Sequence, residues 1–163
     1  MRILGIDPGT GTTGFGIIDV TGINLQLLDF GCIKTSQLLS AADRLHQIAE
    51  DFKSIMQQWN PQTCAIEKIF FAKNIKTAIK VAEARGVLLQ NARKWNLDIY
   101  EYSPSEVKIA VTSDGQADKK QVQKMVQLIL NLNYMPEPDD AADALAIALC
   151  HAQSMKIRSL ERR

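Results

Sequence analysis

Hydrophobic and polar positions along the chain form short segments that predict five strands separated by turns and helices. Apolar runs at 2–7, 15–20 and 25–34 are joined by short turns rich in glycine, threonine and asparagine, which is typical of neighbouring antiparallel strands. Short apolar runs at 63–68 and 97–102 each follow a helical segment and so predict strands added by crossover connections. We therefore expect an α/β domain on a mixed five-stranded sheet, with strands one to three antiparallel and helices flanking the sheet.

Apolar positions three and four residues apart predict two long helices between these strands. The first opens at Ser40, with Asp43 three positions later in the spacing of a capping box, and Asn60-Pro61 ends it. The second runs from about Asn74 to Trp95. We expect its inward face to carry Ile75, Ile79, Ala82, Gly86 and Leu89.

Further helices are predicted after the fifth strand. Ser103-Pro104 starts a short helix that reaches Val107, and Asp118 caps the next one. The last helix begins at "DDAADALAIALCH" (139–151). We expect one domain at 1–153, followed by a polar, basic and disordered tail at 154–163.

The composition is that of a soluble globular protein with a single core. Of the 163 residues, 46% are hydrophobic and 23% are charged, with a net charge of +1. The N-terminus shows no signal-peptide pattern, and no apolar run approaches the roughly 20 residues that a membrane helix needs. Cys32, Cys64 and Cys150 have no zinc or disulfide spacing, so we expect a reduced, cytoplasmic protein without membrane association.

Basic residues are unevenly distributed despite the small net charge. One cluster follows the fourth strand and consists of Lys73, Lys76, Lys80, Arg85, Arg93 and Lys94, with Glu83 as the single acid among them. A second cluster consists of Lys108, Lys119, Lys120 and Lys124. A solvated helix face is the ordinary interpretation of each cluster, and a surface that binds nucleic-acid phosphates is the alternative.

The start of the last helix carries a carboxylate in an unusual position. Asp139 or Asp140 fits a helix N-cap, where acids are favoured. Asp143 instead lies in line with Asp140, Ile147 and Cys150, because residues three and four apart share a helix face. An ionised carboxylate on an apolar stripe costs free energy unless a cation pairs with it or a metal binds it. Asp143 therefore needs a partner from elsewhere in the chain.

Asp7 and Glu67 complete the candidate site, since each lies at the carboxyl end of an apolar strand, where sites in open α/β sheets are found. Several carboxylates at one edge raise one another's pKa, and magnesium, which takes hard oxygen ligands, removes that conflict. We hypothesise a two-magnesium site for phosphodiester hydrolysis. Its ligands are Asp7 bridging both ions, Glu67 on one ion, and Asp140 with Asp143 on the other.

Five segments, taken in order, resemble the motifs of one enzyme family. They are "GIDPGTGTTGFGIID" (5–19), "AIEKIFFAKN" (65–74), "ARGVLLQ" (84–90), "ADKKQVQKMV" (117–126) and "DDAADALAIALCH" (139–151). They resemble the RuvC crossover (Holliday) junction endodeoxyribonucleases over nearly the whole chain. The resemblance implies a ribonuclease-H-like fold and a cytoplasmic bacterial homodimer that acts after the RuvA–RuvB branch-migration complex in recombinational repair. It also implies magnesium-dependent cutting of four-way DNA junctions, with 5′-phosphate and 3′-hydroxyl ends; we expect manganese to substitute.

The resemblance also assigns residues. The family's acids fall on the four carboxylates named above, and its charge-stabilising lysines fall on Lys119 and Lys108. Phe70 matches an aromatic residue at the junction centre and can stack on an unpaired base, although a core position is the ordinary interpretation of such a residue. The expected DNA contacts are Phe70, Lys73, Lys76, Lys80, Lys108, Lys119 and Lys120.

Two segments depart from the family pattern. Relatives often carry an arginine shortly after the "DPG" turn, where this chain has Thr10, Gly11, Thr12 and Thr13, so either a backbone contact or a phosphate contact is expected to be lost there. Ser113 and Asp114 stand where relatives favour glycine and an uncharged residue. Asp114 beside DNA would repel phosphate, which places the details of the 112–118 loop in question.

Three other function classes share part of this pattern. A YqgF-type nuclease acting on RNA has the same fold, but the "DDAAD" helix and the "ADKK" segment favour RuvC. An actin-like ATPase also begins with a glycine-rich "DxGT" turn, yet this chain holds one such turn and no second half-domain. A non-catalytic junction-binding module would lack at least one acid. For the homodimer, we expect the interface on the apolar face of the 74–95 helix.

Overall fold

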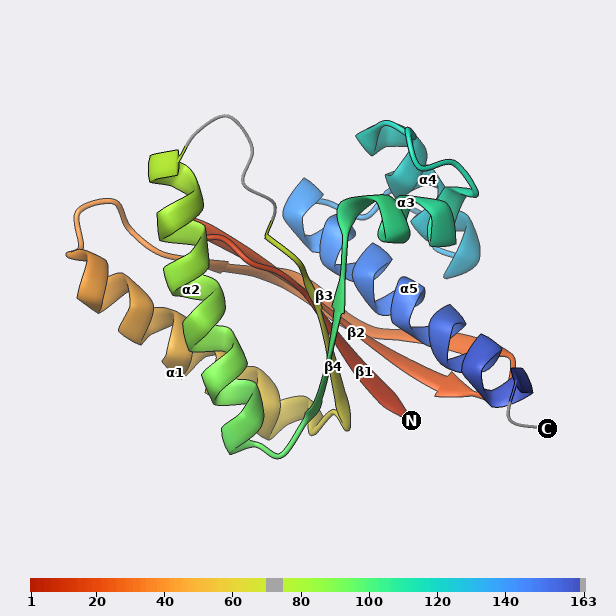
Figure 1. Cartoon of the computed structure of the whole chain (residues 1–163), viewed down its shortest axis with the longest axis horizontal. Coiled ribbons are helices and arrows are strands. Elements are labelled where there is room, and N and C mark those ends of the chain that lie inside the picture. Colours follow the sequence, from red (N-terminus) through yellow and green to blue (C-terminus); the bar gives the residue numbers. More distant parts are fainter. Residues whose placement is uncertain (70–74, 162–163) are drawn as a thin grey trace.

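The computed structural model describes residues 1–69 and 75–161, which form one mixed sheet with helices on both faces (Figure 1). The strands lie in the order β3-β2-β1-β4-β5. Their bounds are Arg2–Asp7 for β1, Thr12–Thr21 for β2, Asn24–Lys34 for β3, Thr63–Glu67 for β4 and Asp98–Tyr102 for β5. β1, β2 and β3 are antiparallel, while β4 and β5 run parallel to β1. The predicted five-stranded mixed sheet is confirmed.

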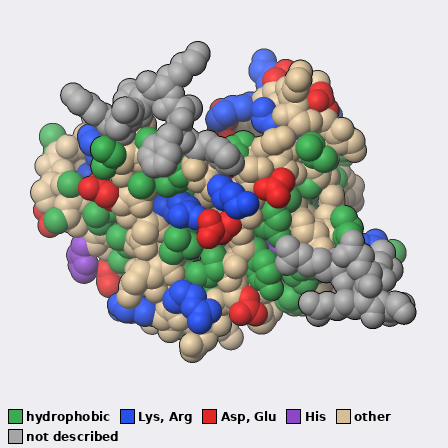
Figure 2. All heavy atoms as spheres, viewed as in Figure 1, with side chains coloured by type: hydrophobic (Ala, Val, Ile, Leu, Met, Phe, Trp, Pro, Cys, Tyr) green, Lys and Arg blue, Asp and Glu red, His purple; other side chains and the backbone are tan. Residues whose placement is uncertain are grey.

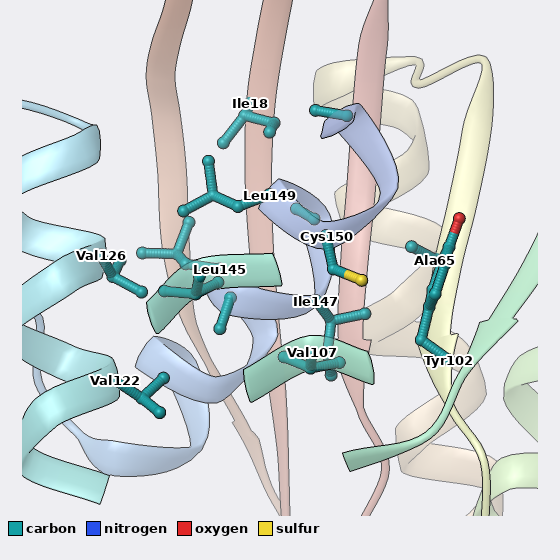
Figure 3. Close-up of a cluster of buried hydrophobic side chains, with 14 of the residues drawn as sticks. Ile18, Ala65, Tyr102, Val107, Val122, Val126, Leu145, Ile147, Leu149 and Cys150 are labelled. Atoms are coloured by element: carbon teal, nitrogen blue, oxygen red, sulfur yellow. The ribbon is translucent and has the colours of Figure 1, made fainter. Parts of the chain in front are cut away.

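The helices are divided between the two faces of the sheet. Helices α1 (Ala41–Trp59) and α2 (Ile75–Lys94) cover one face, and α5 (Asp139–Glu161) crosses the other (Figure 1). The shorter α3 (Pro104–Thr112) and α4 (Lys119–Ile129) pack against α5. Each face has its own hydrophobic cluster. In the cluster beneath α5, Leu145 and Ile147 lie between the sheet and the valines of α3 and α4 (Figure 3).

Three glycines allow α5 to lie very close to the sheet. A Cβ at Gly5 would overlap the carbonyl of Ala144, and one at Gly14 would overlap the carbonyl of Asp140. A Cβ at Gly16 would lie 2.6 Å from the Leu145 side chain. The backbone contacts at Gly5 and Gly14 exclude any larger residue, whereas the nearest atoms at Gly16 belong to a side chain. The sequence therefore fixes where the acidic start of α5 meets β1 and β2.

Helix ends follow the predicted capping chemistry. The Ser40 hydroxyl accepts from the amide of Asp43, and Asn60 ends α1 in the left-handed conformation. Asp118 caps α4 in a capping box with Gln121. Ser103 caps α3, which continues to Thr112 rather than stopping near Val107. Asp139 and Asp140 lie inside the first turn of α5 and are not its N-cap.

The predicted inward face of α2 is wrong. Ile79, Ala82 and Gly86 are exposed and Leu89 is half-buried. The buried stripe consists of Ala84, Leu88 and Ala92. Because small and apolar residues occur at helical spacing on both faces of this helix, the pattern alone does not select the face that packs on β4 and β5. The side chain of Ile75 lies outside the described part.

The last helix also differs from its prediction. It continues through Glu161, across most of the segment at 154–163 that we expected to be disordered. Met155 is half-buried and packs against the α5 cluster, and the residues that follow it include good helix formers. Within the described residues, no helix is long and apolar enough to span a membrane.

Candidate active site

Asp7 and Glu67 lie side by side at one edge of the sheet. β1 and β4 are parallel neighbours in which Ile6 pairs with Ile66, so the next residue of each strand is Asp7 and Glu67. Side chains alternate between the faces of a sheet, and Ile3 and Ala65 belong to the cluster beneath α5. The side chains of Asp7 and Glu67 therefore point toward α5. Both residues lie at the carboxyl ends of their strands, where the sequence predicted the site.

Helix α5 brings a third carboxylate to this edge. Asp7 pairs with Gly14 across β1 and β2, and Gly14 lies against the backbone of Asp140. Asp143, one turn later, lines a cavity of about 340 Å³ together with Asp7 and Glu67. The other residues lining this cavity are Pro104, Val107, Lys108, Lys119, Val122 and Ile147. Strands β1 and β4 and helices α3, α4 and α5 thus all contribute to one site.

Asp140 is placed differently from the other three acids. It lines a neighbouring open cavity with Lys34, Glu137, Pro138 and Asp139. Its negative charge nevertheless raises the pKa of both Asp7 and Asp143. Asp140 therefore lies at the rim of the acidic site, close enough to act on it electrostatically.

Burial and mutual repulsion make the ionised acids unfavourable in the metal-free protein. Burial, followed by the charges of Glu67, Asp143 and Asp140, raises the pKa of Asp7 to about 8. Burial and the charge of Asp143 likewise raise the pKa of Glu67. Burial raises the pKa of Asp143, although Lys119 opposes that shift. A site of this kind favours a bound cation, because positive charge stabilises every one of its ionised carboxylates.

Lys119 supplies part of that positive charge. Its Nζ lies 3.4 Å from Oδ2 of Asp143, and the charge of Asp143 raises the pKa of Lys119. Lys119 is the first residue of α4, and the Asp118 cap holds its backbone in place. A protonated lysine at the mouth of an acidic cavity can pair with a carboxylate or with a phosphate oxygen.

The acids face a common cavity but do not yet form a coordination shell. Among residues 1–69 and 75–161, no three side chains of the histidine, cysteine, aspartate and glutamate types are gathered closely enough to hold a metal as they stand. The chemistry of the donors still fits magnesium or manganese, which prefer carboxylate oxygens and retain waters. The absence of nearby thiolate or imidazole donors in the cavity lining argues against a zinc site.

Arg85 is a residue of this site that the sequence analysis counted only as part of a basic cluster. Its Nε donates to the backbone carbonyl of Glu67 at 3.1 Å, and its Nη2 pairs with the Glu101 carboxylate. The amide of Lys68 also donates to the carbonyl of Tyr102 at 2.8 Å. The end of β4 is thus held from α2 and from β5, which fixes the backbone that carries Glu67.

The predicted DNA contacts are divided by the fold. Lys108 and Lys119 line the acidic cavity, whereas Lys120 lines a separate cavity beside the 112–118 loop. Lys80 lies exposed on α2. Phe70 and Lys73 lie outside the described residues, as does the side chain of Lys76. Among the described side chains on the face shown in Figure 2, acidic and basic groups are interspersed.

Comparison with known proteins decides the family. The family model for crossover junction endodeoxyribonuclease RuvC matches residues 3–151. A crossover junction endodeoxyribonuclease RuvC from Thermotoga petrophila is 49% identical over 158 residues, covering 97% of this chain and 96% of the relative. This chain belongs to the RuvC family. The predicted enzyme class, a crossover junction endodeoxyribonuclease, is confirmed.

Solved RuvC structures agree with this assignment. The structure of Thermus thermophilus RuvC in complex with a Holliday junction substrate has a TM-score of 0.91 and 35% sequence identity, covering 97% of this chain and 96% of that one. The structure titled Thermus thermophilus RuvC has a TM-score of 0.89 at the same identity. The ribonuclease-H-like fold is therefore confirmed, and the YqgF-type and actin-like alternatives are not favoured. RuvC-family nucleases depend on a divalent metal.

One departure from the RuvC pattern has a structural explanation. The Asp114 carboxylate accepts a hydrogen bond of 2.8 Å from the amide of Gln116, and the Asp114 amide donates to the Thr112 hydroxyl. Asp114 therefore shapes the turn between α3 and α4. Its side chain lines the cavity beside Lys120, which places a positive charge near the acid.

Proposed function

We propose that this RuvC-family enzyme cuts four-way DNA junctions symmetrically, nicking two opposite strands to leave 5′-phosphate and 3′-hydroxyl ends. The observation that carries the proposal is the convergence of Asp7, Glu67 and Asp143 on one cavity that also holds Lys108 and Lys119. Hydrolysis of a phosphodiester requires an activated water and stabilisation of the leaving oxygen. The acids favour a bound cation, and protonated lysines lie beside them in the same cavity. Together these groups match both requirements.

The cofactor in this proposal is magnesium, with two ions per subunit and manganese as a substitute. Asp7 is the candidate bridging ligand, because it lies on the central strand between Glu67 and the start of α5. Glu67 is the ligand of one ion, and Asp140 and Asp143 are the ligands of the other. The ions supply a nucleophilic water and polarise the phosphate.

Lys119 has a role of its own in the proposal. In the metal-free protein it is paired with Asp143. A bound cation would be held by the Asp143 carboxylate, which would leave the Lys119 ammonium group available for a phosphate oxygen. Lys119 then stabilises negative charge that develops on the phosphate, and Lys108 does the same from α3. The high pKa of Lys119 keeps it protonated at neutral pH.

Junction binding in the proposal uses one aromatic residue and six lysines. Phe70 stacks on a base at the junction centre, which is worth roughly 1–3 kcal/mol. Contacts with backbone phosphates come from Lys73, Lys76, Lys80, Lys108, Lys119 and Lys120. These contacts are electrostatic, so affinity should fall steeply with salt.

We also propose that the enzyme acts as a homodimer with α2 at the interface. Ile79 is 51% exposed, and Ala82 and Gly86 are exposed beside it, where residues three and four apart share a helix face. A second copy of the chain would cover this face. The two-fold symmetry of the resulting dimer would direct two identical sites to opposite DNA strands. A cytoplasmic role after the RuvA–RuvB complex in recombinational repair is supported by family membership and by the bacterial relatives.

The test is cleavage of a synthetic four-way junction. The protein is incubated in magnesium with an end-labelled junction and, in parallel, with a linear duplex of the same sequence. The proposal predicts paired nicks at symmetric positions in opposite strands, products that DNA ligase reseals, and no cutting of the duplex. Junction binding without nicks would favour a non-catalytic binding module, and equal cutting of the duplex would contradict structure-specific cleavage.

A further inference from the structure

A small polar cavity lies on the face of the sheet that α1 and α2 cover, and it shares no lining residue with the acidic cavity. Its volume is about 220 Å³, and its lining consists of Thr10, Gly11, Arg44, Thr77, Lys80 and Val81. Three elements meet there: the turn that follows Asp7, helix α1 and helix α2. Figure 1 shows α1 and α2 both beginning at the end of the sheet where β1 ends. The cavity is therefore on the same edge as the acids.

Arg44 is fixed over this turn by hydrogen bonds. Its Nε donates to the Thr35 hydroxyl at 2.9 Å, and that hydroxyl donates to the carbonyl of Thr10 at 2.5 Å. A Cβ placed on Gly11 would lie 3.4 Å from Nη2 of Arg44. The guanidinium thus lies across a position that has no side chain, and its Nη groups face the turn.

Lys80 brings a second positive charge to the same cavity. The Thr10 hydroxyl donates to the Lys80 carbonyl at 2.7 Å, which ties the turn to α2. Within residues 1–69 and 75–161, no carboxylate lies within 4.0 Å of the cationic nitrogens of Arg44 or Lys80. The cavity lining contains two cations, two threonines and no acid. Such a lining favours an anion.

This cavity lies at the "DPG" turn, one of the two segments that depart from the family pattern. The turn carries Thr10 to Thr13 where relatives often carry an arginine. Here a guanidinium reaches the same turn from α1. An arginine presents paired N–H donors that match two oxygens of a phosphate. Arg44 is half-buried and already held by one hydrogen bond, so it loses less conformational freedom on binding.

We propose that this cavity binds a phosphate group of the DNA backbone, with Arg44 as the principal contact and Lys80 beside it. The proposal rests on the proposed function, since the DNA is the junction substrate. It makes Arg44 a positioning contact that anchors the strand next to the acidic site. A free phosphate or nucleotide has the same chemistry, so the experiment must separate the two sources.

The test measures junction affinity as a function of salt, with calcium in place of magnesium to prevent cutting. The variants are Arg44→Gln, Arg44→Lys, Lys80→Gln and Thr35→Val. Lys53→Gln is the control, because Lys53 lies on α1 and is paired with Glu50 at 3.3 Å. Lys53→Gln removes the same charge from the same helix away from the cavity. Thermal unfolding of each variant establishes that it is folded.

Loss of one phosphate contact should weaken junction binding by about tenfold at moderate salt and lower the salt slope by about one. We expect this result for Arg44→Gln, a smaller loss for Arg44→Lys and Lys80→Gln, and wild-type binding for Lys53→Gln. Thr35→Val keeps the guanidinium but removes the hydroxyl that holds it, so it should lower affinity less than Arg44→Gln. If Arg44→Gln fails to fold, Lys80→Gln and Arg44→Lys carry the test, and wild-type slopes for both would overturn the proposal.

Two further outcomes separate this proposal from its alternatives. In one outcome, Arg44→Gln binds the junction as tightly as the wild type does but no longer binds inorganic phosphate in a direct titration. That result would assign the cavity to a free phosphate and overturn the proposal. A wild-type protein that neither binds nor cuts the junction would contradict the proposed function instead. The last outcome assumes that the wild type cuts the junction. If Arg44→Gln is then as active and as salt-dependent as Lys53→Gln, only this inference is overturned.

Discussion

Gly14 on β2 lies directly against the backbone carbonyl of Asp140 at the start of α5. Gly14 is also the partner of Asp7 across β1 and β2. One residue without a side chain therefore connects the central strand, which carries Asp7, to the helix that carries Asp140 and Asp143. The spacing among the carboxylates depends on this contact.

The first prediction concerns that contact. Gly14→Ala should lower the free energy of unfolding by about 1–3 kcal/mol or more, because a Cβ meets backbone that cannot move aside. It should also weaken magnesium binding, since the start of α5 must shift away from Asp7. Gly16→Ala is the matched comparison, as its Cβ meets the Leu145 side chain at 2.6 Å, which can rotate. Chemical denaturation and calorimetry measure both effects, and equal losses for the two variants would contradict the argument.

The second prediction concerns the pH dependence of the metal-free protein. The pKa of Asp7 is raised from 3.8 to about 8, so the folded state binds a proton that the unfolded state releases at lower pH. Its contribution to stability is fully present below the unfolded pKa and is lost as pH rises through the folded pKa. The metal-free wild type should therefore lose stability between about pH 4 and 8. Asp7→Asn should be more stable at pH 8, by an amount on the order of a few kcal/mol.

Thermal unfolding in a chelator across this pH range measures the effect. Asp98→Asn is the control, because Asp98 is exposed at the start of β5, away from the cavity. Added magnesium should restore stability to the wild type at pH 8 and leave Asp7→Asn unchanged. The same pH profile in wild type and Asp7→Asn would show that Asp7 does not carry the effect.

The third prediction concerns Arg85 as a positioning residue. Arg85→Gln removes the donor to the Glu67 carbonyl and the partner of Glu101, so Glu67 should be held less firmly. Loss of such a supporting contact typically costs 10–100-fold in metal affinity or activity. We expect cleavage to need more magnesium, with junction affinity in calcium unchanged. Lys94→Gln, which removes an exposed charge at the end of α2, should match wild type.

A purely structural role for Arg85 would give a different result. In that case Arg85→Gln would lower thermal stability while the folded fraction kept the wild-type magnesium dependence. Arg85→Lys is the informative intermediate, because it keeps the charge near Glu101 but supplies fewer fixed donors.

The fourth prediction concerns the exposed face of α2. Ala82→Glu should convert the proposed homodimer to monomer at micromolar concentration, because it places a charge on the proposed apolar interface. Gln57→Glu, on the exposed face of α1, adds the same charge elsewhere and should leave the dimer intact. Sedimentation velocity distinguishes the two. A wild-type protein that is monomeric at that concentration would remove the interface.

Local rules predicted much of this fold. The alternation of apolar and turn segments defined the strands, and Ser40 with Asp43 defined the start of α1. The inward face of α2 could not be predicted, because Ile79, Ala82 and Gly86 form an apolar stripe as regular as the buried one. Only the packing against the sheet distinguishes the two faces.

The sequence also predicted part of the candidate site. Asp7 and Glu67 follow from their positions at the carboxyl ends of strands, and Asp143 follows from its place on an apolar stripe. Arg85 donates to a backbone carbonyl 18 residues earlier in the chain, and Arg44 donates to a hydroxyl nine residues earlier. No sequence spacing encodes such contacts, so both arginines were indistinguishable from solvated surface charges.

The most direct test of the account is a calorimetric titration of magnesium into the wild type and Asp7→Asn at neutral pH. In the wild type, the acids gathered in one cavity should bind magnesium and release a proton as Asp7 ionises. In Asp7→Asn, which lacks the central carboxylate, this binding should be lost. Saturable binding in the wild type and none in Asp7→Asn is the predicted result. Equal affinity in both proteins would contradict the claim that these carboxylates form the metal site.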